Sequence, residues 1–131
     1  MDTYLAIDYG TQRIGLARSF GTLAEPLFIL QNDETLFTEL LRVLSEEGIT
    51  KIIVGVSENV MAEKTKVFAV ELKKYTDLPI HFTDETLSSA SVHEKLYDKN
   101  KKAHKGQYKG PVDHLAAAHF LQEYLDYAET E

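Results

Sequence analysis

The stretch YLAIDYGTQRIGLA, residues 4–17, places one aspartate inside a segment that otherwise has the pattern of a buried β-strand. A buried carboxylate loses its hydration, so Asp8 must be paired, bound to a metal or kept neutral. Alternation along the strand puts Asp8 on the same face as Ala6 and opposite Ile7. Because Gly10 follows closely, this stretch alone fits an aspartate that caps a turn as well as it fits a functional carboxylate.

The apolar pattern on both sides of this stretch predicts an α/β fold. We expect strands at residues 3–9, 14–20, 26–31, 51–56 and 78–83. Between and after these strands, the sequence predicts helices outlined by Leu36–Leu44, by Val67, Val70, Leu72 and Tyr75, by Leu87–Tyr97, and by residues 110–128. Asn32 or Asp33 is expected to cap the first helix, Gly48 to end it, and Pro26 to begin the third strand.

This order of elements predicts a mixed five-stranded sheet with helices on both faces. The first three strands are joined by short links and should be antiparallel, whereas the later ones alternate with helices. The ribonuclease H-like fold has this order. The chain length of 131 residues predicts a single domain, residues 1–131.

Composition excludes several classes of protein. No apolar run approaches the roughly 20 residues that a membrane-spanning helix needs, and the N-terminal residues do not have the pattern of a signal peptide. The chain has no cysteine, so disulfides and thiolate metal sites are excluded. We therefore expect a cytoplasmic protein without membrane contact.

A basic segment stands out against the net charge of -7. KNKKAHKGQYK, residues 99–109, holds five of the 14 basic residues and no acid. A solvated loop is the usual interpretation of an isolated lysine run. A concentrated positive segment on an acidic chain can also attract nucleic acid, which the net charge alone would hide.

Three acidic positions lie beside strong structural boundaries. Asp8 is near the end of the first strand, Glu85 follows the fifth, and Asp113 falls in the first turn of the last helix. Acids favour that helical position for dipole reasons alone. If the central strands are parallel, however, their carboxyl ends bring Asp8 and Glu85 together, and a helix across that edge can add Asp113. Converging carboxylates require a hard cation such as Mg²⁺, as in metal-assisted phosphodiester hydrolysis.

Separate motifs along the chain resemble one known family. IDYGTQRIGLA resembles the opening D-x-G-x-x-R-x-G motif of the YqgF family, also called RuvX or Holliday-junction-resolvase-like. KIIVGV corresponds to that family's fourth strand, FTDETLSS to its D-E-R-L-[ST]-[ST] motif, and KGPVDHLAAAHFLQEYL to its motif on the last helix. The resemblance covers essentially the whole chain, in order.

The resemblance implies a ribonuclease H-like fold and a metal-dependent nuclease that uses Mg²⁺ or Mn²⁺. It assigns catalysis and metal binding to Asp8, Glu85 and Asp113. It implies that the nucleic-acid backbone is held by Arg13, Lys101, Lys102, Lys105 and Lys109, and that Gly10 and Gly15 shape the turn. Members are associated with maturation of the 5′ end of 16S ribosomal RNA and, earlier, with Holliday junctions. The implied partner is therefore pre-rRNA or branched DNA, and the chain would act as a monomer or a homodimer.

Two departures from the family pattern and two rival functions stay open. Thr86 replaces the family's arginine, and the loop at 57–66 contains no glycine. Asp-x-Gly-Thr also opens actin-like and sugar-kinase ATPases, in which Gly10 and Thr11 would contact phosphates, but those enzymes need a second domain. A non-catalytic RNA-binding module is the other rival. Arg13 is either a phosphate clamp or a turn residue that pairs with a nearby acid.

Overall fold

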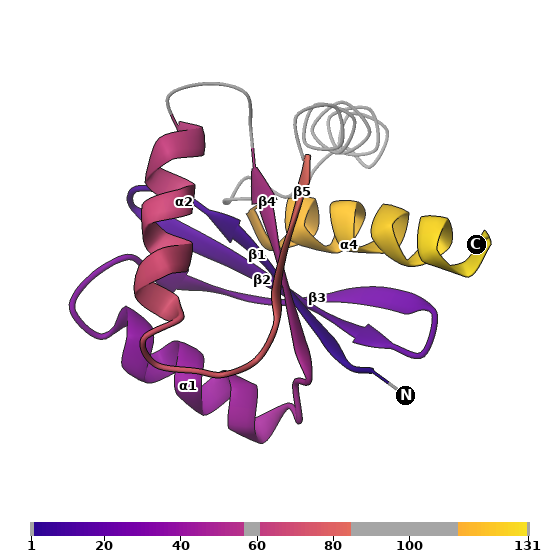
Figure 1. The fold of residues 1–131 in the computed structure, drawn as a ribbon, viewed down its shortest axis with the longest axis horizontal. Coiled ribbons are helices and arrows are strands. Elements are labelled where there is room, and N and C mark those ends of the chain that lie inside the picture. The colour runs from indigo at the N-terminus through magenta and orange to yellow at the C-terminus, as the bar shows by residue number, and fades with distance from the viewer. Residues whose placement is uncertain (1, 57–60, 85–112, 131) are drawn as a thin grey trace, which may run out of the picture.

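A mixed five-stranded sheet forms the centre of the molecule (Figure 1). The computed structural model describes residues 2–56, 61–84 and 113–130. The strands are β1 (Tyr4–Tyr9), β2 (Arg13–Phe20), β3 (Leu23–Gln31), β4 (Lys51–Val56) and β5 (Ile80–Asp84). Their order across the sheet is β3-β2-β1-β4-β5. The β1–β2 and β2–β3 pairs are antiparallel, and the β1–β4 and β4–β5 pairs are parallel, which confirms the predicted mixed sheet.

Helices cover both faces of this sheet, as predicted. α1 (Leu36–Glu46) and α2 (Met61–Leu72) lie on one face, and α4 (Asp113–Thr130) lies across β1, β2 and β3 on the other (Figure 1). The helix predicted at 87–97 lies outside the described residues. Within the described part of the chain, no helix is long and apolar enough to cross a membrane.

Alternation along β1 divides the core into two clusters. Leu5 and Ile7 pack with the apolar faces of α1 and α2, whereas Ala6 packs with Phe120 and Leu121 of α4. All five of these side chains are at most 1% exposed. A strand buried on both faces is expected at the centre of an α/β sheet. This division places the Asp8 side of β1 on the α4 face.

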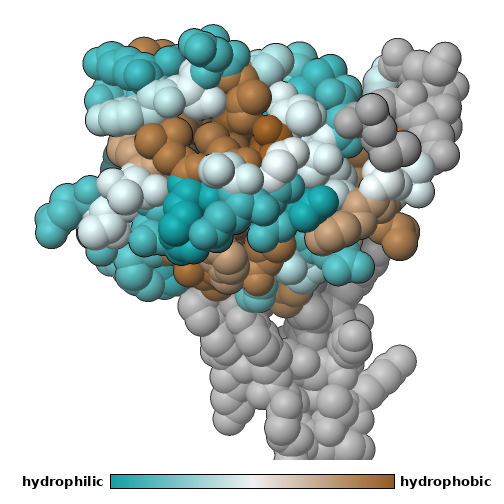
Figure 2. Space-filling model, turned by 90° about the horizontal axis from the view of Figure 1, so that it is seen from below, coloured by the Kyte–Doolittle hydropathy of each residue, from teal (hydrophilic) through white to brown (hydrophobic). Residues whose placement is uncertain are grey.

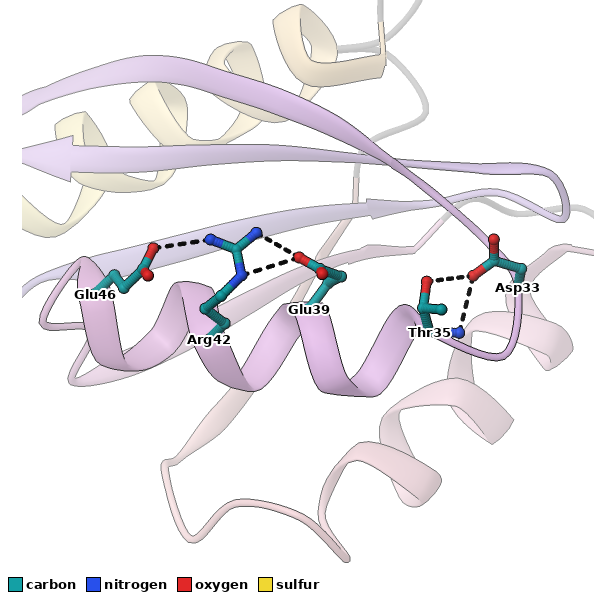
Figure 3. Close-up of polar contacts among 5 residues, drawn as sticks. All are labelled: Asp33, Thr35, Glu39, Arg42 and Glu46. Carbon is teal, nitrogen blue, oxygen red and sulfur yellow. Dashed lines mark hydrogen bonds and ion pairs between the residues drawn. The ribbon is translucent and has the colours of Figure 1, made fainter.

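The boundaries of α1 differ in part from the prediction. The helix begins after Thr35, and Asp33 accepts hydrogen bonds from the Thr35 amide (2.9 Å) and hydroxyl (2.6 Å) (Figure 3). These bonds lower the pKa of Asp33. Gly48 ends the helix as predicted, with a φ of 65° that favours glycine.

A network of charged side chains runs along the exposed side of α1. Arg42 binds Glu39 and, at 3.0 Å, Glu46, which lie one turn before and one turn after it (Figure 3). The two carboxylates raise the pKa of the Arg42 guanidinium. Such exposed pairs add little to helix stability, because water and salt screen them.

The buried face of α2 agrees only in part with the apolar spacing that predicted this helix. Val67 and Val70 are 68% and 63% exposed, and Tyr75 lies beyond the end of the helix. Leu72, which belongs to the predicted pattern, is buried, and Phe68 is buried in place of the two valines. A phenylalanine removes more apolar surface from water than a valine, so Phe68 decides which side of the helix faces the sheet.

β3 is longer than predicted, because it continues through Pro26 back to Leu23. Pro26 lies opposite Ala17, where the β2–β3 register shifts after Gly15. A proline is tolerated at such an irregularity on an edge strand, since no ladder hydrogen bond is required from its nitrogen.

Candidate active site

The hairpin between β1 and β2 presents Asp8 at the carboxyl edge of the sheet. Asp8 lies directly opposite Gly15 in the antiparallel register. Between the strands, a β-carbon on Gly10 would be 2.5 Å from the backbone oxygen of Arg13, so the connection can close this tightly only with glycine there.

Asn32 ties this hairpin to the end of β3. Its side-chain amide donates to the backbone oxygen of Gly10 (2.8 Å) and to the hydroxyl of Tyr9 (3.1 Å). Its backbone N–H donates to the oxygen of Gln12 at 2.9 Å. The sequence pattern predicts only a helix cap at Asn32. The structure assigns it to holding the turn beside Asp8.

Gly15 lies inside β2 rather than in the turn where the resemblance placed it. A β-carbon at this position would be 2.1 Å from the carbonyl carbon of Asp113 and 2.5 Å from the amide nitrogen of His114. The first turn of α4 therefore rests directly on Gly15. Residues opposite each other in an antiparallel pair have Cα atoms about 4.5–5.5 Å apart. Through Gly15, strand β1 and helix α4 therefore place the backbones of Asp8 and Asp113 close to each other.

Arg13 and Asp113 form an ion pair across this junction. Arg13 Nε donates to Asp113 Oδ2 at 3.0 Å, although 100 residues separate them in the chain. Their side chains are 43% and 28% exposed. This is the second of the two roles considered for Arg13, pairing with a nearby acid. A guanidinium has five N–H donors, so this contact leaves Arg13 able to bind a phosphate as well.

Gln122 holds α4 in place from farther along the helix. Its amide donates to the backbone oxygen of Thr22 and accepts from the amide of Ala24, both at 2.8 Å. Thr22 lies in the β2–β3 turn and Ala24 lies at the start of β3, and a single sequence gives no means of linking either residue to this helix. Gln122 and Gly15 together fix the position of Asp113.

The third expected carboxylate, Glu85, lies outside the described residues, as do Lys101, Lys102, Lys105, Lys109 and Thr86. The strand before Glu85 is described: β5 runs parallel to β4, with Asp84 opposite Val56. The carboxyl ends of β1, β4 and β5 thus share one edge of the sheet (Figure 1). No group of three or more candidate metal ligands occurs among residues 2–56, 61–84 and 113–130.

The donor atoms at this edge fit a hard cation. Asp8 and Asp113 offer carboxylate oxygens, and Mg²⁺ is usually held by one or two carboxylates together with waters and substrate phosphates. The N-terminus of α4 and the guanidinium of Arg13 both favour a negative charge on Asp113.

The fold and the sequence match proteins of known families. A protein of Sulfurihydrogenibium sp. (strain YO3AOP1), named for a pre-16S rRNA nuclease activity, is 37% identical over 136 residues, which cover 96% of this chain and 91% of the relative. A protein of Nitratidesulfovibrio vulgaris with the same name is 31% identical, with 97% of this chain and 95% of the relative covered.

Solved structures share the fold at low sequence identity. T. thermophilus RuvC in complex with a Holliday junction substrate superposes with a TM-score of 0.62 at 14% identity, covering 99% of this chain and 96% of RuvC. The fowlpox virus Holliday junction resolvase gives a TM-score of 0.56 at 13% identity, covering 98% and 99%. The chain therefore has the predicted ribonuclease H-like fold. The family model for RuvX, described as Holliday junction resolvase, matches residues 2–127, and the chain belongs to the RuvX family.

Proposed function

We propose that this protein is a metal-dependent nuclease that hydrolyses phosphodiester bonds during processing of the 5′ end of pre-16S ribosomal RNA. The observation that carries the proposal is the packing of the Asp113 backbone on Gly15, the register partner of Asp8, at the carboxyl edge of the sheet. The names of the relatives at 37% and 31% identity support rRNA as the substrate. Such a role belongs in the cytoplasm.

Asp8 and Asp113, with Glu85 after β5, would hold Mg²⁺ or Mn²⁺. When bound, such an ion activates water and stabilises charge on the leaving oxygen of a phosphodiester. The chain's own contribution is to position these carboxylates relative to each other. β1 fixes Asp8, and the seat of α4 on Gly15 fixes Asp113 relative to it.

Arg13 and the lysine segment would hold the nucleic-acid backbone. Arg13 borders the carboxylates and is 43% exposed, so it can reach a phosphate without leaving the site. The sequence adds Lys101, Lys102, Lys105 and Lys109 shortly before α4. These basic side chains would attract the phosphates of the nucleic acid, whereas the carboxylates would bind the metal.

Resolution of branched DNA is the second candidate activity. The description of the matching family favours this activity. The likeness to the T. thermophilus and fowlpox virus resolvases shows a shared fold. A junction resolvase is expected to act as a homodimer so that it cuts two strands symmetrically, whereas an RNA-processing enzyme can act as a monomer.

A direct comparison of substrates tests the proposal. The purified full chain is incubated with end-labelled RNA spanning the 5′ end of 16S rRNA, or with a four-way DNA junction, in Mg²⁺ or in EDTA. We expect cleavage of the RNA in Mg²⁺, none in EDTA, and an intact junction. Cleavage of the junction alone would favour the second candidate, and failure to cut either substrate would contradict the nuclease assignment.

A further inference from the structure

A hollow lies between α1 and α2, on the face of the sheet opposite α4. It has a volume of about 460 Å³, within the roughly 300–1,000 Å³ typical of ligand sites. The view from below the molecule shows apolar side chains gathered into a patch with hydrophilic side chains on either side (Figure 2). We call the hollow the α1–α2 groove; Tyr9, Phe37, Val67 and Phe68 supply its apolar lining.

Stacked aromatic rings line this groove. The ring centroids of Tyr9 and Phe68 are 4.7 Å apart at an interplanar angle of 30°, and those of Phe37 and Phe68 are 5.8 Å apart at 21°. Phe68 is 5% exposed, whereas Tyr9 and Phe37 are only partly buried. Phe37 also stacks on Tyr75, with ring centroids 4.9 Å apart at 17°, so Phe37 and Phe68 each lie between two other rings. Tyr9 ends this row of rings beside the hairpin, and its partly exposed ring is the surface on which another flat ring can stack.

The polar lining of the groove does not suit a phosphate. Two acids, Glu63 and Glu71, line it against one lysine, Lys64. Glu71 also pairs with Lys74 at 3.2 Å. The amide of Asn32 already donates both hydrogens, so its carbonyl oxygen is the group left to accept from a ligand. Carboxylate and carbonyl oxygens accept hydrogen bonds from the amino groups of nucleobases, whereas they repel phosphate.

The groove is continuous with the carboxylate site through the hairpin. Tyr9 lines the groove and also the small hollow formed by Gly10, Thr11, Gln12 and Arg13. Arg13 in turn binds Asp113, and Asp8 immediately precedes Tyr9. A strand whose phosphate lies at the carboxylates can therefore turn a neighbouring base over the hairpin towards the stacked rings.

We propose that the α1–α2 groove binds one unpaired nucleobase of the substrate strand, adjacent to the phosphodiester held at Asp8 and Asp113. This assignment rests on the proposed nuclease function and adds a subsite to it. A base inside a duplex cannot reach the groove, because its faces are already stacked on its neighbours. The substrate must then be single-stranded, or opened, at that nucleotide.

Binding of RNA in EDTA tests the groove separately from cleavage. Single-stranded RNAs covering the 16S 5′ end are compared by fluorescence anisotropy with a series that lacks one base at each position in turn. We expect one position, next to the cut, where loss of the base weakens binding to the wild-type chain about tenfold. A series in which every position behaves alike would overturn the proposal.

Two matched variants locate that effect in the groove. Val67→Asp places a charge in the lining, whereas Val70→Asp places the same charge on the same helix outside it; these valines are 68% and 63% exposed, so neither change disturbs the core. Val67→Asp should weaken binding of the intact RNA about tenfold, and the affinity of this variant should no longer depend on the missing base. Val70→Asp should behave as wild type.

Other outcomes separate this proposal from its alternatives. If Val67→Asp binds RNA as wild type does, the groove has another occupant, such as a helix of a partner protein, and the nucleobase assignment is wrong. Equal losses in both variants would also overturn it, because the effect would be general charge repulsion. A wild-type chain that shows the base-dependent position but cuts nothing would support the groove and contradict the nuclease. Cleavage without any base-dependent position would support the nuclease and contradict the groove.

Discussion

Gly15 of β2 and Asp113 of α4 are in direct backbone contact: a β-carbon on Gly15 would lie 2.1 Å from the carbonyl carbon of Asp113. Gly15 is also the register partner of Asp8. One glycine therefore determines how closely α4 approaches the β1–β2 pair and, through that distance, how far Asp113 lies from Asp8. Its role depends on the absent side chain and not on an unusual backbone angle.

Gly15→Ala is expected to displace the first turn of α4. Overpacking costs about 1–3 kcal/mol in general, and the upper end applies where the obstacle is backbone. We expect a lower denaturation midpoint together with a loss of metal-dependent cleavage.

Gly21→Ala is the matched control. A β-carbon there would meet no atom within 4 Å, but φ is +64°, so the backbone penalty is about 1–2 kcal/mol. This variant should lose stability and keep its cleavage rate per folded molecule. Equal loss of cleavage in both variants would show that activity is limited by stability and not by the packing of α4 on Gly15.

Arg13→Gln should alter nucleic-acid binding more than stability. The Arg13–Asp113 pair is partly exposed, and such pairs add less than about 1 kcal/mol. If Arg13 also contacts a phosphate, the slope of log affinity against log salt should fall by about one. RNA binding measured over a series of salt concentrations gives this slope.

Arg42→Gln removes the same charge from α1, where the guanidinium lies between Glu39 and Glu46. It should leave the salt slope unchanged. A variant at position 13 that loses stability but keeps the wild-type slope would limit Arg13 to its ion pair with Asp113.

The turn before α1 predicts a dependence of stability on pH. The hydrogen bonds from Thr35 lower the pKa of Asp33, so they stabilise its charged form in the folded chain. Their contribution is present at neutral pH and is lost as the pH falls through the lowered pKa of Asp33. Thr35→Val removes the hydroxyl and should raise that pKa towards its usual value.

NMR titration of the Asp33 carboxyl group measures this shift. The stability difference between wild type and Thr35→Val should be seen at neutral pH and vanish in acid. An unchanged pKa in the variant would contradict the role given to the Thr35 hydroxyl.

Local patterns predicted the sheet well and the contacts between distant elements poorly. The alternation of Ala6 and Ile7 identified the two faces of β1, because both faces of a central strand are buried. Spacing alone could not choose between the Val67 and Phe68 sides of α2, because both repeat at helical intervals. Phe68 decides this choice through its larger apolar surface.

The candidate site shows the same limit. Asp8 and Asp113 could be singled out from their motifs and boundaries. The ion pair of Arg13 with Asp113 and the seat of α4 on Gly15 depend on how a helix about 100 residues away packs on the hairpin. No local periodicity encodes that packing, so only the folded chain could supply it.

The most direct test of the nuclease site is the single-turnover rate of RNA cleavage in Mg²⁺ by Asp8→Asn, compared with wild type and with Asp77→Asn. Asp77 is an exposed aspartate in the link between α2 and β5, at the other edge of the sheet, so it controls for the lost charge. Metal ligation contributes several kcal/mol, so Asp8→Asn should slow cleavage at least about a hundredfold while its unfolding midpoint shows that it is folded. Asp77→Asn should cut at the wild-type rate. A folded Asp8→Asn variant that cuts as fast as wild type would contradict the account.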